Sequence, residues 1–209
     1  MVRRNSLPRS RAQGGASKPP SRGAGAVRIL AGAFKRTPLA VADRPGLRPT
    51  PERVRETVFD WLTHLTGGDW QAVRALDMFS GSGAMALECV SRGAARAVAI
   101  EKDRAGARAI AAIAEKLGAR DRLAVVCGDA LLWTKSALET FDIVFIDPPF
   151  ASRLQLAAAK AALNVLAPGG LIYLESEELI ADEALGQTGL TAVRRGKAGA
   201  VHYLLAKAA

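Results

Sequence analysis

The sequence predicts one α/β domain built on a mostly parallel sheet, and three observations lead to this prediction. From residue 72 onward, apolar runs of strand length alternate with helical patterns, which is typical of a parallel sheet covered by helices on both faces. The chain has 209 residues and is 49% hydrophobic, enough for one sizeable core. Its last segment predicts two strands joined by a glycine-bearing turn. We therefore expect seven strands, with an antiparallel hairpin at one edge.

Residues 1–25 differ from the rest of the chain in charge and composition. They contain six basic residues and no acidic residue, against a net charge of +9 for the whole chain. They are also rich in Ser, Gly and Pro, with too few large apolar residues to offset the entropy of ordering. We expect a disordered basic tail, followed by one domain at 26–209. The tail can neutralise phosphates as a flexible arm, or it can be a solubilising extension or a cleaved transit-like segment.

The remaining composition excludes several classes of protein. No apolar run approaches the about eighteen residues that a membrane span needs, and the first residues lack the apolar core of a secretory signal. The two cysteines, Cys89 and Cys127, form no C-x-x-C or Cys/His cluster, so neither disulfides nor a zinc site is predicted. We expect a soluble, cytoplasmic monomer without a bound metal.

The first part of the domain, residues 26–66, predicts a small extension in front of the main sheet. Its expected elements are two short strands at 26–34 and 38–42 and a helix at 48–65. Thr50 is expected to cap this helix, with Pro51 in the first helical position. Helical spacing predicts a buried stripe formed by Val54, Val58, Trp61, Leu62 and Leu65.

After this extension, strands and helices are expected to alternate. The strands are predicted at 72–77, 96–101, 122–127, 141–147 and 169–175, with the final hairpin within 190–207. The helices between them are predicted at 83–92, 103–117, 130–138 and 152–166. In an open parallel sheet, ligands bind at the carboxyl ends of the strands, near the point where strand order reverses. Functional residues are therefore expected at these strand ends.

A glycine turn follows the first parallel strand. The segment DMFSGSGAMALE places Asp77 at the strand end and Gly81 and Gly83 in the turn into the next helix. Glycine lets the backbone approach a ligand closely, and the start of a helix offers unpaired N–H groups. Together with Ala86, the glycines also fit the G-x-G-x-x-A dinucleotide pattern, and a structural turn without a ligand is an alternative.

Acidic residues end the next two strands as well. Glu101 can accept hydrogen bonds from both hydroxyls of a ribose, and Asp129 can accept one from an adenine amine. A single acid at a strand end commonly caps a helix. Acids at the ends of three consecutive strands instead favour an adenosine ligand that lies across the strand tips. S-adenosylmethionine fits this pattern better than NAD, whose pyrophosphate would occupy the helix start.

The segment FIDPPF ends a buried strand with an acid and two prolines. The Asp147 carboxylate and the Pro148 carbonyl can accept both protons of an exocyclic base amine and so direct its lone pair toward a methyl donor. Phe150 can stack on the extruded base, and the prolines hold the acceptors rigidly. Termination of the strand by proline alone is the alternative. The motif predicts transfer of a methyl group to an amine.

The motifs DMFSGSG, AIEKD, CGDA and DPPF, in this order, resemble those of the class I S-adenosylmethionine-dependent methyltransferases, which have a Rossmann-like fold. The segments VRILAGAFKRTPLAV, PGLRPTPERVRETVFDWL and LIYLESE are similar to the bacterial 16S ribosomal RNA guanine-N2 methyltransferases of the RsmD family. The resemblance covers roughly residues 27–206. It implies methylation of one guanine N2 amine in the RNA of the small ribosomal subunit, guanine 966 in the family.

The resemblance also implies a role for each residue that matches a family motif. The residues implied for cofactor binding are Asp77, Phe79, Gly81, Ser82, Gly83, Glu101, Lys102, Asp129 and Ala130. Those implied for the amine and base site are Asp147, Pro148, Pro149 and Phe150. Those expected to face the RNA are Arg48, Thr50, Arg53, Arg55, Arg194 and Lys197; a solvated or intramolecular ion pair and an ordinary charged turn are the alternatives for the helix and the hairpin.

Two other functions remain open from the sequence. The Asp-Pro-Pro-aromatic motif also occurs in enzymes that methylate adenine N6 or a protein glutamine, because those substrates present a similar amine. A noncatalytic RNA-binding assembly factor that retains the methyltransferase fold is the second alternative, although the intact cofactor and amine motifs argue against it.

Overall fold

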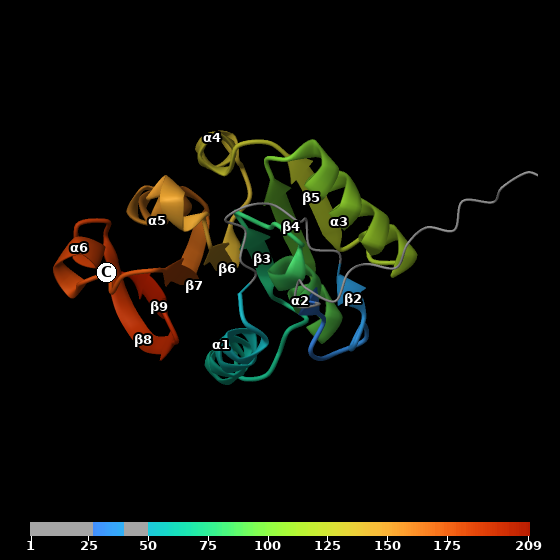
Figure 1. The fold of residues 1–209 in the computed structure, drawn as a ribbon, viewed down its shortest axis with the longest axis horizontal. Helices are drawn as coiled ribbons and strands as arrows, with labels where there is room; N and C mark the ends of the chain where they lie inside the picture. Colours follow the sequence, from blue (N-terminus) through green and yellow to red (C-terminus); the bar gives the residue numbers. More distant parts are fainter. Residues whose placement is uncertain (1–26, 40–49) are drawn as a thin grey trace, which may run out of the picture.

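The computed structural model describes residues 27–39 and 50–209, and a seven-stranded sheet forms its centre (Figure 1). The strand order is β5-β4-β3-β6-β7-β9-β8. Pairs from β5 to β7 are parallel, whereas β9 pairs antiparallel with both β7 and β8. The strands are β3 (Arg74–Asp77), β4 (Arg96–Glu101), β5 (Leu123–Cys127), β6 (Phe141–Ile146), β7 (Leu166–Ser176), β8 (Leu190–Ala198) and β9 (Val201–Ala208). The predicted sheet with its antiparallel edge hairpin is confirmed; the expected tail at residues 1–25 lies outside the described residues.

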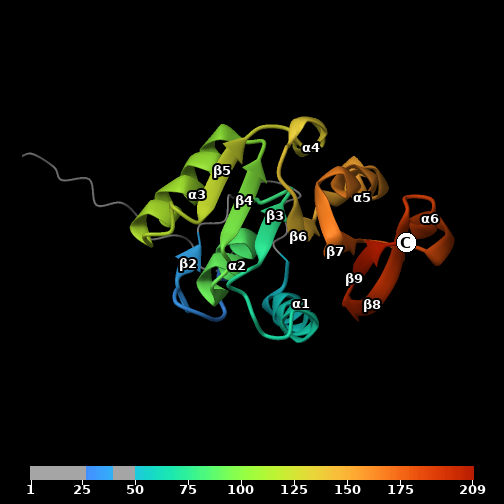
Figure 2. The ribbon, with the colours of Figure 1, turned by 180° about the vertical axis from the view of Figure 1, so that it is seen from behind.

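Helices cover both faces of this sheet (Figures 1 and 2). Residues of α1 (Glu52–Leu65), α2 (Ala84–Arg92) and α3 (Arg104–Lys116) belong to the core on one face. Residues of α4 (Ala130–Ser136), α5 (Gln155–Ala162) and α6 (Asp182–Gly186) belong to the core on the opposite face. Short 3₁₀ helices occur at η1 (Phe150–Ser152) and η2 (Leu163–Val165). The sequence did not predict α6, whose single turn buries only Leu185 and therefore has no helical periodicity to detect.

The two predicted N-terminal strands pair as a separate hairpin of β1 (Val27–Arg28), which is shorter than predicted, and β2 (Pro38–Leu39); residues 40–42 of the second predicted strand lie outside the described residues. This hairpin docks on α2 through the buried carboxylate of Glu88, which accepts hydrogen bonds from the backbone N–H groups of Leu30 at 2.7 Å and Ala31 at 3.0 Å. The N–H groups of the segment that follows β1 thus find their acceptors in α2.

The helix α1 differs from its prediction at its start and in its buried face. Pro51, not Thr50, occupies the N-cap position, and no side chain caps the helix. The buried residues are Val54, Arg55, Val58, Phe59 and Leu62, whereas Trp61 is only partly buried and Leu65 is 39% exposed. The buried face is therefore rotated relative to the predicted stripe, because Phe59 packs against Trp70 and Phe145 with ring centroids 5.8 Å apart in both pairs.

The strand order reverses at β3, which pairs with β4 on one side and β6 on the other. Because helices connect the strands on opposite faces to either side of this point, the carboxyl ends of β3, β4 and β6 open onto a crevice. Within residues 27–39 and 50–209, no helix combines the length and apolar character required to cross a membrane.

Candidate active site

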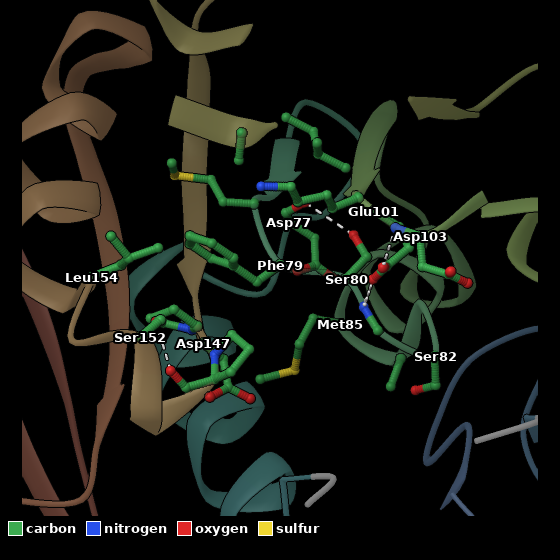
Figure 3. Close-up of a pocket in the computed structure, with 18 of the residues that line it drawn as sticks. Asp77, Phe79, Ser80, Ser82, Met85, Glu101, Asp103, Asp147, Ser152 and Leu154 are labelled. Atoms are coloured by element: carbon green, nitrogen blue, oxygen red, sulfur yellow. Dashed lines mark hydrogen bonds between the residues drawn. The ribbon is translucent and has the colours of Figure 1, made fainter. Parts of the chain in front are cut away.

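A cavity of about 610 Å³ lies at the carboxyl ends of these strands (Figure 3). This volume falls within the range typical of sites for small ligands. Asp77, Glu101 and Asp147, which follow or end three different strands, all line the same pocket. The predicted site residues in its wall are Thr50, Arg55, Asp77, Phe79, Gly81, Ser82, Glu101, Lys102, Asp129, Ala130, Asp147, Pro148, Pro149 and Phe150.

Asp77 ends β3, lines the cavity and is 3% exposed. Burial raises the pKa of its carboxyl to about 7, although hydrogen bonds from the backbone of Ala86 and from Ser80 oppose the shift. Among the described residues, no hydrogen-bond donor reaches its Oδ2 atom. A buried acceptor without a partner is costly, so this atom fits a ligand that brings its own cationic donor, such as the ammonium of an amino-acid moiety.

Glu101 ends β4 and is held by two backbone N–H groups. Gly81 donates to its Oε2 atom at 2.8 Å, and Asp103 donates to its Oε1 atom at 2.8 Å. Gly81 has a φ of 52°, in the left-handed region that favours glycine. Each carboxylate oxygen has a second lone pair. The two oxygens can therefore still accept hydrogen bonds from paired hydroxyls in the cavity.

Asp129 follows β5 and caps α4, accepting hydrogen bonds from the N–H groups of Leu131 at 3.0 Å and Leu132 at 3.2 Å. Its Oδ2 atom also accepts one from Lys102 Nζ at 3.2 Å. Partial burial raises the pKa of Asp129, but the hydrogen bonds from Lys102 and α4 outweigh it and hold the pKa below its usual value. Asp129 thus has the capping role that the sequence left open, and it lies in the cavity wall as well.

The DPPF segment leaves the end of β6 and forms the opposite part of the cavity wall (Figure 3). Pro148 is buried, whereas Pro149 is exposed and its carbonyl accepts hydrogen bonds from the Ser152 N–H at 2.8 Å and the Ser152 hydroxyl at 2.6 Å. Within the described part of the chain, no donor reaches the Pro148 carbonyl. The segment therefore presents the Asp147 carboxylate and the Pro148 carbonyl as two fixed acceptors.

The surroundings of Asp147 disfavour its charge. Burial raises the pKa of Asp147 well above its usual value, the nearby carboxylates of Glu175 and Asp77 raise it further, and a hydrogen bond from Thr50 opposes them. Glu175 is itself buried in β7 and accepts a hydrogen bond from the Tyr173 hydroxyl at 2.7 Å. A carboxylate with a raised pKa is well suited to take up a proton near neutral pH.

Several predicted site residues do not lie in this cavity. Gly83 caps α2 with a φ of 77°, and a Cβ atom there would approach the Ile110 side chain to 2.9 Å, so its position serves packing. Arg53, Arg194 and Lys197 are exposed outside the cavity. Arg48 lies outside the described residues.

Arg55 corrects the sequence prediction for the RNA surface. Its side chain is 2% exposed and donates a hydrogen bond to the Arg28 carbonyl at 2.9 Å, which ties α1 to the N-terminal hairpin. Burial lowers its pKa, although the neighbouring acids Glu88, Glu52 and Glu56 oppose the shift. Arg55 is therefore buried between the hairpin and the cavity wall and does not face an RNA at the surface.

The sequence also missed residues that line the cavity. The missed apolar residues include Met85, Ile100 and Leu154. The missed polar residues include Ser80, Ser152 and Asp103, and Asp103 caps α3 through a hydrogen bond from the Gly106 N–H at 2.7 Å. Ile100 and Asp103 adjoin Glu101, so proximity to a strand end was an available signal. Met85 and Leu154 lie on helical and connecting segments whose orientation depends on tertiary packing.

The fold and the cavity together define a Rossmann-like methyltransferase. A family model described as conserved hypothetical protein 95 matches residues 27–207. The chain belongs to this family, which confirms the resemblance to the RsmD family of ribosomal RNA methyltransferases. It is 37% identical over 195 residues to ribosomal RNA small subunit methyltransferase D of Escherichia coli K12, covering 90% of this chain and 93% of that protein.

Solved structures agree with this assignment. The structure of Escherichia coli yhhF, named as a methyltransferase, has a TM-score of 0.73 and 32% identity, covering 88% of this chain and 98% of that one. A hypothetical protein from Thermus thermophilus has a TM-score of 0.72 and 29% identity, covering 86% and 98%. A more distant methyltransferase, solved in complex with S-adenosylhomocysteine, shares the fold at 16% identity and a TM-score of 0.60, covering 78% and 50%.

Proposed function

We propose that this protein transfers a methyl group from S-adenosylmethionine to the exocyclic N2 amine of a guanine in 16S ribosomal RNA, at the family site guanine 966. The observation that carries the proposal is the pair of acceptors, Asp147 and Pro148, beside a cavity whose other wall holds Asp77 and Glu101. Relatives named for small-subunit ribosomal RNA support the class of substrate.

The residues of the cavity fit S-adenosylmethionine. Asp77 can accept from the ammonium of the methionine moiety, because its buried Oδ2 atom has no hydrogen-bond donor among the described residues. Glu101 can accept from the ribose hydroxyls with the lone pairs that the backbone leaves, and Ile100 and Leu131 can contact the adenine. When bound, this cofactor supplies an electrophilic methyl group on a sulfonium sulfur.

The chain's own residues prepare the amine. The Asp147 carboxylate and the Pro148 carbonyl accept its two protons, which turns the nitrogen lone pair out of conjugation with the base. As the nitrogen gains the methyl group it loses one proton, and Asp147 is placed to take that proton because its pKa is raised well above the usual value. Phe150, partly exposed at the cavity wall, can stack on the extruded base.

Exposed cations near α1 can hold the RNA backbone. Arg53 lies in the first turn of α1, next to the cavity residue Thr50, and is exposed. Arg194 on β8 stacks over the ring of Trp61 in α1, 5.9 Å from its centroid, and Lys197 lies further along the same strand. Arginine can bind phosphate through two parallel hydrogen bonds, so these exposed side chains are the candidates for contact with the RNA backbone.

The experiment that tests the function follows a labelled methyl group. Small-subunit RNA from cells that lack the protein, genomic DNA and cellular protein are each incubated with the enzyme and labelled S-adenosylmethionine, with Asp147→Ala as the control. We expect label only in 16S ribosomal RNA, as N2-methylguanine by mass spectrometry, and none with Asp147→Ala. Label in DNA adenine or in protein would transfer the assignment to another amine substrate. Absence of calorimetric binding to S-adenosylmethionine would favour the noncatalytic assembly factor.

A further inference from the structure

A hydrogen bond joins the N-terminal extension to the tip of β6. The Thr50 hydroxyl donates to Asp147 Oδ2 over 3.0 Å, although the two residues are 97 positions apart in the sequence. Both residues line the cavity. The contact therefore lies within the site and reaches the carboxylate that the proposed function assigns to the amine.

The start of α1 leaves this hydroxyl available. A residue before proline is restricted to extended conformations, and Pro51 itself occupies the N-cap position with a φ of −56° and a ψ of 143°. The N–H groups of Val54 and Arg55 both donate to the Pro51 carbonyl, at 2.9 and 3.1 Å. Thr50 is thus not used to cap the helix, and its side chain is directed across the cavity wall to Asp147 instead.

Thr50 is also the group that counteracts the acidic surroundings of Asp147. Glu175 faces Asp147 from β7 and Asp77 faces it from β3, and both disfavour its negative charge, as does burial. The hydroxyl of Tyr173 on β7 donates its hydrogen bond to Glu175. The hydrogen bond from Thr50 favours the charged form and lowers the pKa of Asp147 against these influences.

We propose that Thr50 is a positioning residue for the amine site, whose hydroxyl holds Oδ2 of Asp147 so that the rest of the carboxylate is directed at the substrate amine. This inference rests on the proposed function for its catalytic consequence, but the coupling between the two residues can be measured without any substrate. A hydroxyl has a single proton to donate, so the bond to Asp147 fixes the orientation of both side chains. The extension before the sheet thereby becomes part of the catalytic apparatus.

The first test measures the titration of Asp147 in the cofactor-free protein. Carboxyl ¹³C shifts of labelled aspartate are followed with pH, and the Asp147 signal is assigned by its loss in Asp147→Asn. We expect Thr50→Val, which keeps the shape but removes the hydroxyl, to raise the pKa of Asp147. Thr50→Ser should leave it close to the wild-type value. An unchanged titration in Thr50→Val would overturn the proposal.

The second test measures methyl transfer on ribosomal RNA over a range of pH. We expect Thr50→Val to lower kcat about tenfold near neutral pH, as loss of one hydrogen bond to a charged group predicts. Its acid limb should move to higher pH, with unchanged calorimetric affinity for S-adenosylmethionine. Thr50→Ser should restore most of the rate. A serine variant as defective as the valine variant would assign Thr50 to packing instead.

A matched control separates these effects from a change in α1. The Thr63 hydroxyl donates to the Phe59 carbonyl at 2.7 Å within the same helix, away from the cavity. Thr63→Val should leave the Asp147 titration and the pH profile unchanged, and an equal shift in this variant would refute a specific role for Thr50. If wild-type protein methylates none of the substrates, the proposed function fails, whereas the carboxyl titration still decides the coupling.

Discussion

The backbone N–H of Gly81 donates a hydrogen bond to Glu101 Oε2 at 2.8 Å, so the glycine turn after β3 is fixed by the acid that ends β4. The Asp103 N–H holds the other oxygen at 2.8 Å. One carboxylate thus orients two loops of the cavity and presents its remaining lone pairs to a ligand. Because each oxygen accepts a backbone hydrogen bond and can also contact a ligand, a neutral amide cannot replace the carboxylate.

Replacing Glu101 by Gln should therefore weaken S-adenosylmethionine about as much as replacing it by Ala. The amide nitrogen would face a backbone N–H, whereas a carboxylate accepts at both positions. A buried hydrogen bond to a charged group contributes about 1.5–3 kcal/mol, so calorimetric affinity should fall at least about tenfold. The exposed Glu183→Ala serves as a control and should bind normally. Unchanged affinity in Glu101→Gln would place the ribose elsewhere.

Methyl transfer should depend on the ionisation of Asp147, which should occur at a higher pH than the ionisation of an ordinary aspartate. Burial, followed by Glu175, raises the pKa of Asp147 well above its usual value. Since the carboxylate is the form that accepts the amine protons, activity should be lost as pH falls through this raised pKa. The pH profile of kcat measures the effect, and an acid limb near pH 4 would contradict it.

Replacing Asp147 by Asn should remove activity without loss of the cofactor. One oriented electrostatic contact typically contributes on the order of a hundredfold or more in rate. Calorimetry should give a wild-type affinity for S-adenosylmethionine, because Asp147 acts on the amine. Asp60→Asn, an exposed change on α1, is the matched control and should retain turnover. Near-normal turnover in Asp147→Asn would contradict the assignment of the amine site.

Asp77 should make the cofactor-free protein less stable as pH rises. Its folded pKa of about 7 lies above the ordinary value of 3.8, so the folded state binds more protons than the unfolded state between these values. The free energy of unfolding therefore falls across this window, by on the order of 4 kcal/mol for about three pKa units. Urea denaturation at pH 5 and pH 8 samples about two of these units and should show a loss of about 3 kcal/mol, which Asp77→Asn should reduce. Equal pH dependence in both proteins would exclude this role.

The strand ends were predicted well because each of these predictions depends only on a local pattern in the sequence. Apolar runs located β3, β4, β5 and β6, and the acid after or at the end of each run then lies at the same edge of a parallel sheet by geometry alone. That reasoning required no knowledge of long-range contacts. It accordingly placed Asp77, Glu101 and Asp147 in one cavity.

The remaining features depend on contacts between distant segments. Arg55 was expected to face the RNA because it matches the family's helix entry and arginine can bind phosphate, yet it is buried and donates its hydrogen bond to the Arg28 carbonyl of the N-terminal hairpin. Thr50 was expected to cap α1, yet its partner is Asp147. No periodicity in a single segment encodes either contact, since each is decided by how the extension docks on the sheet.

Deleting residues 1–25 should weaken the binding of RNA without changing the affinity for S-adenosylmethionine. The deleted segment carries six of the net nine positive charges, and none of the cofactor or amine motifs lies within it. Each phosphate contact releases counterions, so losing up to six contacts should reduce the slope of log affinity against log salt by up to about four to five. Because phosphate contacts carry little sequence information, the position of the methylated guanine should not change. Binding of one ribosomal RNA substrate to full-length and truncated protein, measured at several salt concentrations, decides the matter: identical affinities and slopes would assign residues 1–25 to solubility alone.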